Sequence, residues 1–111
     1  MALMSEPVVS RQDDTRKQLG AFLRARRESL DPQRLGLPRS GRRRTPGLRR
    51  EEVAMLADVG VTWYTWLEQG RDVNPSSAVM AAVAKALQCT PTEARHLFVL
   101  AGLPPGEAPQ A

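Results

Sequence analysis

The most distinctive chemistry in this sequence of 111 residues is a run of arginines near its middle. Six arginines and no acidic residue lie between positions 39 and 50, namely Arg39, Arg42, Arg43, Arg44, Arg49 and Arg50. The flanking stretches carry a net charge of +2 over residues 1–38 and −4 over residues 51–111. Such a cluster of guanidinium groups creates a local field that attracts polyanions. The alternative is a solvated loop whose charge only keeps it soluble.

The sequence offers few residues suited to catalysis or metal binding. The chain has one cysteine, Cys89, and one histidine, His96, which excludes an internal disulfide framework and zinc sites built from several cysteines or histidines. We find no Ser-His-Asp set, carboxylate pair or glycine-rich phosphate loop, so we expect no enzyme, cofactor or metal. Cys89 is expected to be a small buried residue, and His96 a surface or half-buried helix residue.

The composition favours a protein that stays in the cytoplasm. Apolar residues make up 41% of the chain, enough for a modest core. No apolar run is long enough to span a bilayer, and residues 1–10 lack the features of a signal peptide. We therefore expect a small soluble intracellular domain without a membrane partner.

The pattern of apolar residues and turn formers predicts an all-α fold of five helices and no strand. The expected helices cover residues 14–30, 49–57 and 61–69, then begin at 75–77 for the fourth and run from 91 to about 101 for the fifth. A long basic loop should join the first two. The expected organisation is a disordered arm at 1–13, a domain at 14–102 and a Pro-rich tail or linker at 103–111.

Helical spacing also predicts which side chains face inward. In the first helix Leu19, Leu23 and Leu30 share the apolar face with Phe22, and the polar side carries Arg24, Arg26, Arg27 and Glu28. The second helix should bury Leu48, Val53, Leu56 and Ala57. Asp31 is placed to cap a single turn that begins at Pro32, and Thr90 with Glu93 forms a capping box for the last helix.

Residues 50–69 match a helix-turn-helix, in which two short helices are joined by about three residues. The turn needs a residue that tolerates a left-handed backbone, and Asp58 can do so less easily than glycine. The second of the two helices should bury Tyr64 and Leu67. It then exposes an outward set with two threonines and a tryptophan, which is unusual for a purely structural helix: Val61, Thr62, Thr65, Trp66 and Gln69.

At this point the sequence resembles the lambda-repressor-like (Xre) helix-turn-helix family, and more narrowly the MmyB-like transcription regulators. The resemblance covers roughly residues 15–103 and rests on RRRTPGLRREEVA at 42–54, VTWYTWLEQGR at 61–71 and the HLF and LAG groups within 96–102. It departs from the family at Asp58, where glycine is usual, and at Gly60, where serine is usual. The resemblance implies a five-helix DNA-binding domain of a bacterial regulator.

The resemblance also implies which residues would touch double-stranded DNA. The helix at 61–69 would enter the major groove, with base contacts from Val61, Thr62, Thr65 and Trp66. Backbone contacts would come from Arg42, Arg43, Arg44, Arg49, Arg50 and Trp63. Alternatives remain open: Trp66 could pack on a neighbouring helix, Trp63 could lie in the core, and Arg50 could pair with Glu51 or Glu52.

Two rival functions remain open as well. One is a protein-interaction adaptor or antitoxin with little specific DNA binding, and the other is a non-specific nucleic-acid binder. For the regulator we expect a homodimer on DNA. Any small-molecule effector would act through a second domain that this chain does not contain.

Overall fold

The computed structural model describes residues 11–37 and 47–110. This part of the chain contains five α-helices, two short 3-10 helices and no strand. The α-helices are α1 (Arg11–Ser29), α2 (Arg50–Ala57), α3 (Val61–Glu68), α4 (Ser77–Ala86) and α5 (Pro91–Leu100), and the 3-10 helices are η1 (Pro32–Leu35) and η2 (Pro105–Glu107). The predicted all-α fold with five helices is therefore confirmed.

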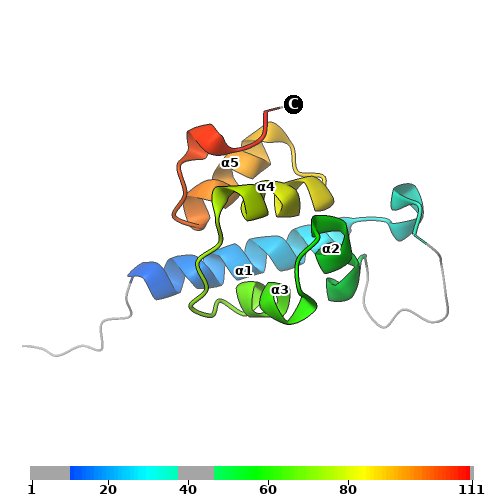
Figure 1. Ribbon diagram of the computed structural model, residues 1–111, viewed down its shortest axis with the longest axis horizontal. Coiled ribbons are helices and arrows are strands. Elements are labelled where there is room, and N and C mark those ends of the chain that lie inside the picture. The colour runs from blue at the N-terminus through cyan, green and yellow to red at the C-terminus, as the bar shows by residue number, and fades with distance from the viewer. Residues whose placement is uncertain (1–10, 38–46, 111) are drawn as a thin grey trace, which may run out of the picture.

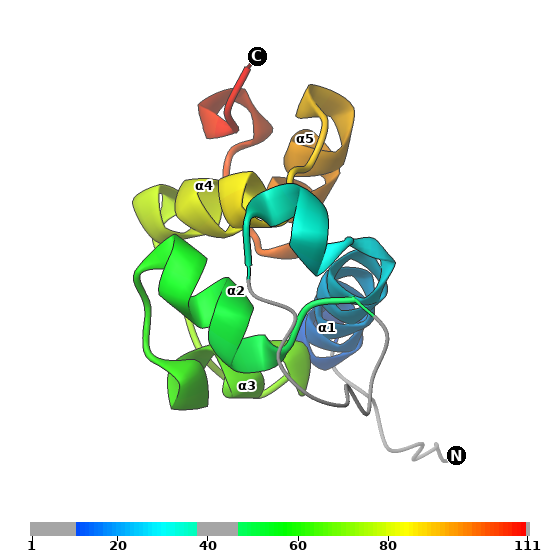
Figure 2. The same ribbon diagram turned by 90° about the vertical axis from the view of Figure 1, so that its right-hand side faces the viewer.

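The helices pack in layers, with α1, the longest of them, at a level between α3 and α5 (Figures 1 and 2). In both views α3 lies along the lower edge of the molecule, while α5 and η2 lie at the upper edge. The core joins these levels with fully buried side chains from all five α-helices: Leu23, Val53, Tyr64, Leu67, Met80, Val83, Leu97 and Phe98. Leu48, which precedes α2, is also fully buried.

Local signals explain where several helices begin. The Thr90 hydroxyl accepts a hydrogen bond from the Glu93 amide at 3.1 Å, and the Glu93 carboxylate accepts one from the Thr90 amide at 2.8 Å. This is the expected capping box. The Ser76 hydroxyl likewise accepts from the amide of Val79 at the start of α4, and Asp31 caps η1 by accepting from the amide of Gln33.

The close approach of α1 to α3 depends on Gly20. A Cβ atom added at this position would lie 2.1 Å from the backbone oxygen of Glu68 at the end of α3. No side chain fits at that distance, so glycine is required by the packing of the two helices rather than by its backbone angles.

The structure differs from the sequence expectations at both ends. Helix α1 begins at Arg11, inside the stretch expected to be a disordered arm. Its first turns are helical although their residues are polar. After Gly102, the expected tail instead forms η2 and buries Ala108, which is 5% exposed. A proline-rich segment can fold back onto the domain when its small apolar side chains pack against the core.

Two assignments of helix faces were also wrong. Arg27, expected on the polar side of α1, is only 4% exposed. Leu56, expected in the inward stripe of α2, is 42% exposed. Helical spacing fails at Arg27 because a charged side chain can be buried where an opposite charge meets it.

Candidate nucleic-acid interface

Helices α2 and α3 form a helix-turn-helix whose tight turn is set by Asp58 and Gly60. Asp58 adopts the left-handed conformation, with φ 57° and ψ 48°, as the sequence predicted. The amide of Val59 then donates to the carbonyl of Ala54 at 2.9 Å. Gly60 is extended and serves as the N-cap of α3 without a side-chain acceptor. The turn thus redirects the chain within three residues and sets the angle between the two helices.

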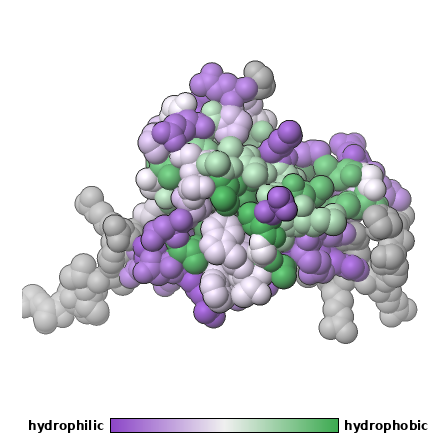
Figure 3. Space-filling model, in the orientation of Figure 1, coloured by the Kyte–Doolittle hydropathy of each residue, from purple (hydrophilic) through white to green (hydrophobic). Residues whose placement is uncertain are grey.

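Helix α3 divides its side chains between the core and the surface. Tyr64 and Leu67 are buried, as predicted. On the other side Val61 is 43% exposed, Trp66 is 40% exposed and Thr62 is exposed. Figure 3 shows pale and green atoms, of intermediate and apolar hydropathy, over the lower edge of the molecule where α3 lies. This outward face can therefore offer hydroxyl and apolar groups to a ligand.

Thr65 and Trp63 occupy less open positions than the rest of the predicted contact set. Thr65 is half-buried, and its hydroxyl donates to the carbonyl of Val61 at 2.8 Å, so its proton is used inside the helix. Trp63 is half-buried and packs against the core. Trp66 is more open and lies beneath the Arg71 guanidinium, 5.8 Å from the ring centroid. This arrangement adds Arg71, which the sequence reasoning missed, to the edge of the α3 surface.

Behind that surface lies a buried ion pair between α1 and α3. The guanidinium of Arg27 donates from Nε to Oε2 of Glu68 at 2.6 Å and from Nη2 to Oε1 at 3.0 Å. Nη1 donates to the backbone oxygen of Leu48 at 2.9 Å. Both side chains are at most 5% exposed. One arginine thereby ties α1 to the end of α3 and to the residue that leads into α2.

The charges of this pair shift the neighbouring ionisation equilibria. Burial alone would raise the pKa of the Glu68 carboxyl, but the hydrogen bonds and charge of Arg27 bring it below its usual value, so the carboxylate is ionised at neutral pH. Burial and the negative charge of Glu68 raise the pKa of Tyr64. This raised pKa keeps Tyr64 neutral at neutral pH, and within the described residues its buried hydroxyl has no hydrogen-bond partner.

The predicted backbone-contact arginines are only partly within the described structure. Arg42, Arg43 and Arg44 lie outside the described residues. Arg49 and Arg50 are half-buried at the start of α2. Nε of Arg50 donates to Oε1 of Glu68 at 3.1 Å, so its partner is Glu68 rather than Glu51 or Glu52.

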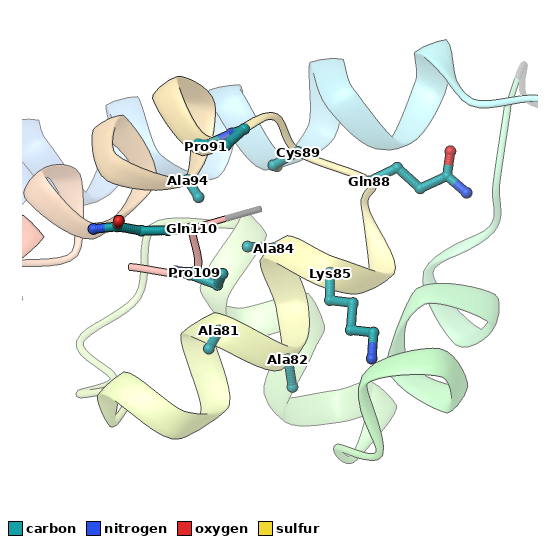
Figure 4. Close-up of a pocket in the computed structure, with 10 residues that line it drawn as sticks. All are labelled: Ala81, Ala82, Ala84, Lys85, Gln88, Cys89, Pro91, Ala94, Pro109 and Gln110. Carbon is teal, nitrogen blue, oxygen red and sulfur yellow. The ribbon is translucent and has the colours of Figure 1, made fainter. Parts of the chain in front are cut away.

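Apolar groups also lie on other parts of the described surface. On α2, Met55 is 61% exposed beside Leu56. A groove of about 450 Å³ lies between α4, α5 and the C-terminal segment, away from α3 (Figure 4). Alanine and proline side chains line the groove from both helices, with Lys85 and Gln88 at one side. Cys89 lines it, and burial raises the pKa of this thiol to about 11, so it is protonated at neutral pH.

Other kinds of site find no support in the residues that the structure describes. No group of three or more histidine, cysteine, aspartate or glutamate side chains is placed to hold a metal ion within residues 11–37 and 47–110. In the same part of the chain, no helix has the length and apolar character needed to cross a bilayer.

Comparison with known proteins agrees with the geometry of α2 and α3. Neither the curated proteins nor the solved structures contain a match to this chain. A protein-family model described as a helix-turn-helix domain matches residues 18–97. The matched region begins within α1 and ends within α5, so it covers all of α2, α3 and α4, parts of α1 and α5, and more than half of the chain. The chain belongs to the helix-turn-helix domain family.

Proposed function

We propose that this domain is a sequence-specific DNA-binding transcription regulator of the lambda-repressor-like, MmyB-like kind. Helix α3 enters the major groove of double-stranded DNA, where Val61, Thr62 and Trp66 contact base edges and Thr65 lies beside them. The observation that carries this proposal is the division of α3, which buries Tyr64 while leaving Thr62 open. A threonine hydroxyl can serve several bases, and an apolar group can meet the methyl group of thymine.

The start of α2 and the loop before it supply the phosphate contacts in this proposal. Arg49 and Arg50 stand at a helix N-terminus, where the helix dipole already favours an anion. Trp63 contributes from the rim of α3. Arg42, Arg43 and Arg44 would follow the backbone or enter the adjacent minor groove, whose potential favours arginine.

The salt dependence of binding tests the phosphate contacts. With five arginines on phosphates, the slope of log affinity against log salt should be roughly −3 to −5 for one domain. Replacing Arg42, Arg43 and Arg44 together by alanine should weaken binding to cognate and random duplexes alike and flatten the slope. An unchanged slope would show that the loop does not touch DNA.

We further propose that two copies bind adjacent half-sites on DNA. For both α3 helices to meet the major groove from one side, the half-sites must be about one helical turn apart, roughly 34 Å. The apolar stripes of the domain are used mainly by its own core, which leaves little surface for a tight dimer. Sedimentation should therefore show a monomer alone and two copies on a duplex with two half-sites, whereas a tight dimer without DNA would contradict this assembly.

A second candidate function is protein contact through α2, favoured by the exposed side chains of Met55 and Leu56. An adaptor of this kind would bind DNA weakly at physiological salt. Selection of bound duplexes from a random pool separates the two functions. A regulator enriches one sequence, and a palindrome in that sequence would also report the symmetry of the complex. An adaptor enriches none.

A further inference from the structure

Glu68 is shared by two arginines from different helices. Its Oε2 accepts from Arg27, and its Oε1 accepts both from Nη2 of Arg27 at 3.0 Å and from Nε of Arg50 at 3.1 Å. The Glu68 side chain is only 1% exposed. A single buried carboxylate at the end of α3 therefore connects α1 with the first residue of α2.

The two arginines differ in how completely they are used. All three guanidinium nitrogens of Arg27 donate hydrogen bonds to Glu68 and Leu48, and its side chain is 5% exposed. The bidentate contact with Arg27 already neutralises the carboxylate. The Arg50 side chain is 38% exposed, and its two Nη nitrogens have no hydrogen-bond partner in the described part of the chain. The Arg50 guanidinium thus adds a positive charge that Glu68 does not need for neutralisation. Its Nε is bonded to Glu68, and its Nη nitrogens have no partner among the described residues.

Because of its shape, a guanidinium group that is bonded at one nitrogen is restricted in its orientation. The group is planar and presents its N–H donors in a rigid fork. With Nε held by Glu68, the guanidinium is anchored at one donor, and the N–H groups of its two Nη nitrogens are left for another partner. An arginine held in this way loses less rotamer freedom on binding an anion than a free one does.

We propose that Glu68 is a positioning residue that aims the Nη groups of Arg50 at a DNA phosphate. This inference rests on the proposed function, in which Arg50 is one of the backbone contacts. It gives Glu68 a role beyond the buried ion pair with Arg27 that joins α1 to α3. By holding Arg50, the last residue of the base-reading helix also sets the geometry of a phosphate contact made from α2.

Replacement of Arg50 by lysine or by alanine tests the proposal, because both residues suit an exposed helical position. Loss of one phosphate contact in Arg50→Ala should weaken binding about fivefold near 0.15 M salt and reduce the salt slope by about 0.9. Arg50→Lys should weaken binding nearly as much, since the ammonium group is a point charge that turns to Glu68 and offers no second edge. Arg95→Lys is the control, because Arg95 is exposed on α5, bonds Thr92 and is outside the proposed DNA contacts; it should change affinity less than about twofold.

The Glu68→Gln variant provides an independent arm. Its fold is first checked by helical circular dichroism at low temperature. It should weaken DNA binding to the extent of Arg50→Lys, and the double variant should be no weaker than either single one. A purely structural role for Glu68 would instead give effects that multiply in the double variant. If Glu68→Gln does not fold, the comparison at Arg50 decides alone.

The outcomes separate the inference from the proposed function. If Arg50→Lys binds like the unmodified domain while Arg50→Ala loses affinity, only charge matters and the positioning role is overturned. If Arg50→Ala also binds normally, Arg50 is no phosphate contact and the inference fails while DNA binding stands. If the unmodified domain binds no duplex at all, the proposed function fails and the inference fails with it.

Discussion

The α4–α5 half of the domain and the junction of α1, α2 and α3 are stabilised by different kinds of interaction. Helices α4 and α5 are capped by Ser76 and Thr90, whose hydroxyls accept hydrogen bonds from amides three residues ahead. At the junction, Arg27 and Glu68 bond across 41 positions of the chain inside the core. The caps of the first region join neighbours in sequence, whereas the ion pair of the second joins residues that meet only in the folded protein.

The difference matters because the junction also carries the candidate DNA surface. Helix α2 has arginine at its N-cap, and an arginine side chain has no hydrogen-bond acceptor for the exposed amides. The amide of Arg49 instead donates to Glu52 at 2.7 Å, and Arg27 holds the carbonyl of Leu48 just before the helix. A local bond to Glu52 and a long-range bond from Arg27 thus stand in for a side-chain acceptor at the N-cap of α2.

The largest expected effect is at the buried ion pair. Arg27→Met should lower the free energy of unfolding by about 3–5 kcal/mol, because it leaves the Glu68 charge in the core with only Arg50 beside it. Arg24→Met is the matched control, since Arg24 forms an exposed pair with Glu28 on the same helix. That variant should cost less than about 0.5 kcal/mol. Urea unfolding followed by tryptophan fluorescence measures both, and equal costs would show that the junction is not special.

The next effect is at the crossing of α1 and α3. Gly20→Ala should destabilise the domain by about 2 kcal/mol, although alanine favours helices by about 1 kcal/mol, because the new Cβ would collide with the backbone of Glu68. Gly106→Ala serves as the control, since a Cβ there meets nothing within 4 Å. Thermal unfolding compares the two. A stabilised Gly20 variant would mean that the two helices can move apart at little cost.

The smallest effect is at a local cap of the other half. Thr90→Ala should cost about 1 kcal/mol, since it removes the acceptor for the Glu93 amide. Thr92→Ala, at the second residue of the same helix, should cost less than about 0.5 kcal/mol. Chemical denaturation measures both costs. A loss at Thr90 as large as that at Arg27 would remove the contrast between the two regions.

The sequence predicted what depends on local spacing. The five helices, the Thr90–Glu93 box, the left-handed Asp58 and the buried Tyr64 follow from patterns within a few residues. Arg27 and Gly20 were missed because a charge or a glycine on a helix gives no local sign of the partner it will meet. An arginine on an otherwise apolar face was the one available signal at Arg27. The base and phosphate contacts remain predictions, since the structure contains no DNA.

The central claim is that the outward face of α3 recognises DNA sequence. Competition binding with a selected duplex and a random duplex tests it most directly, on the unmodified domain and on Thr62→Ala and Trp66→Ala. We predict that each change lowers binding to the selected duplex by about 1–3 kcal/mol and leaves binding to random DNA nearly unchanged. Equal affinity of the unmodified domain for both duplexes, or equal losses on both in the two variants, would contradict the claim.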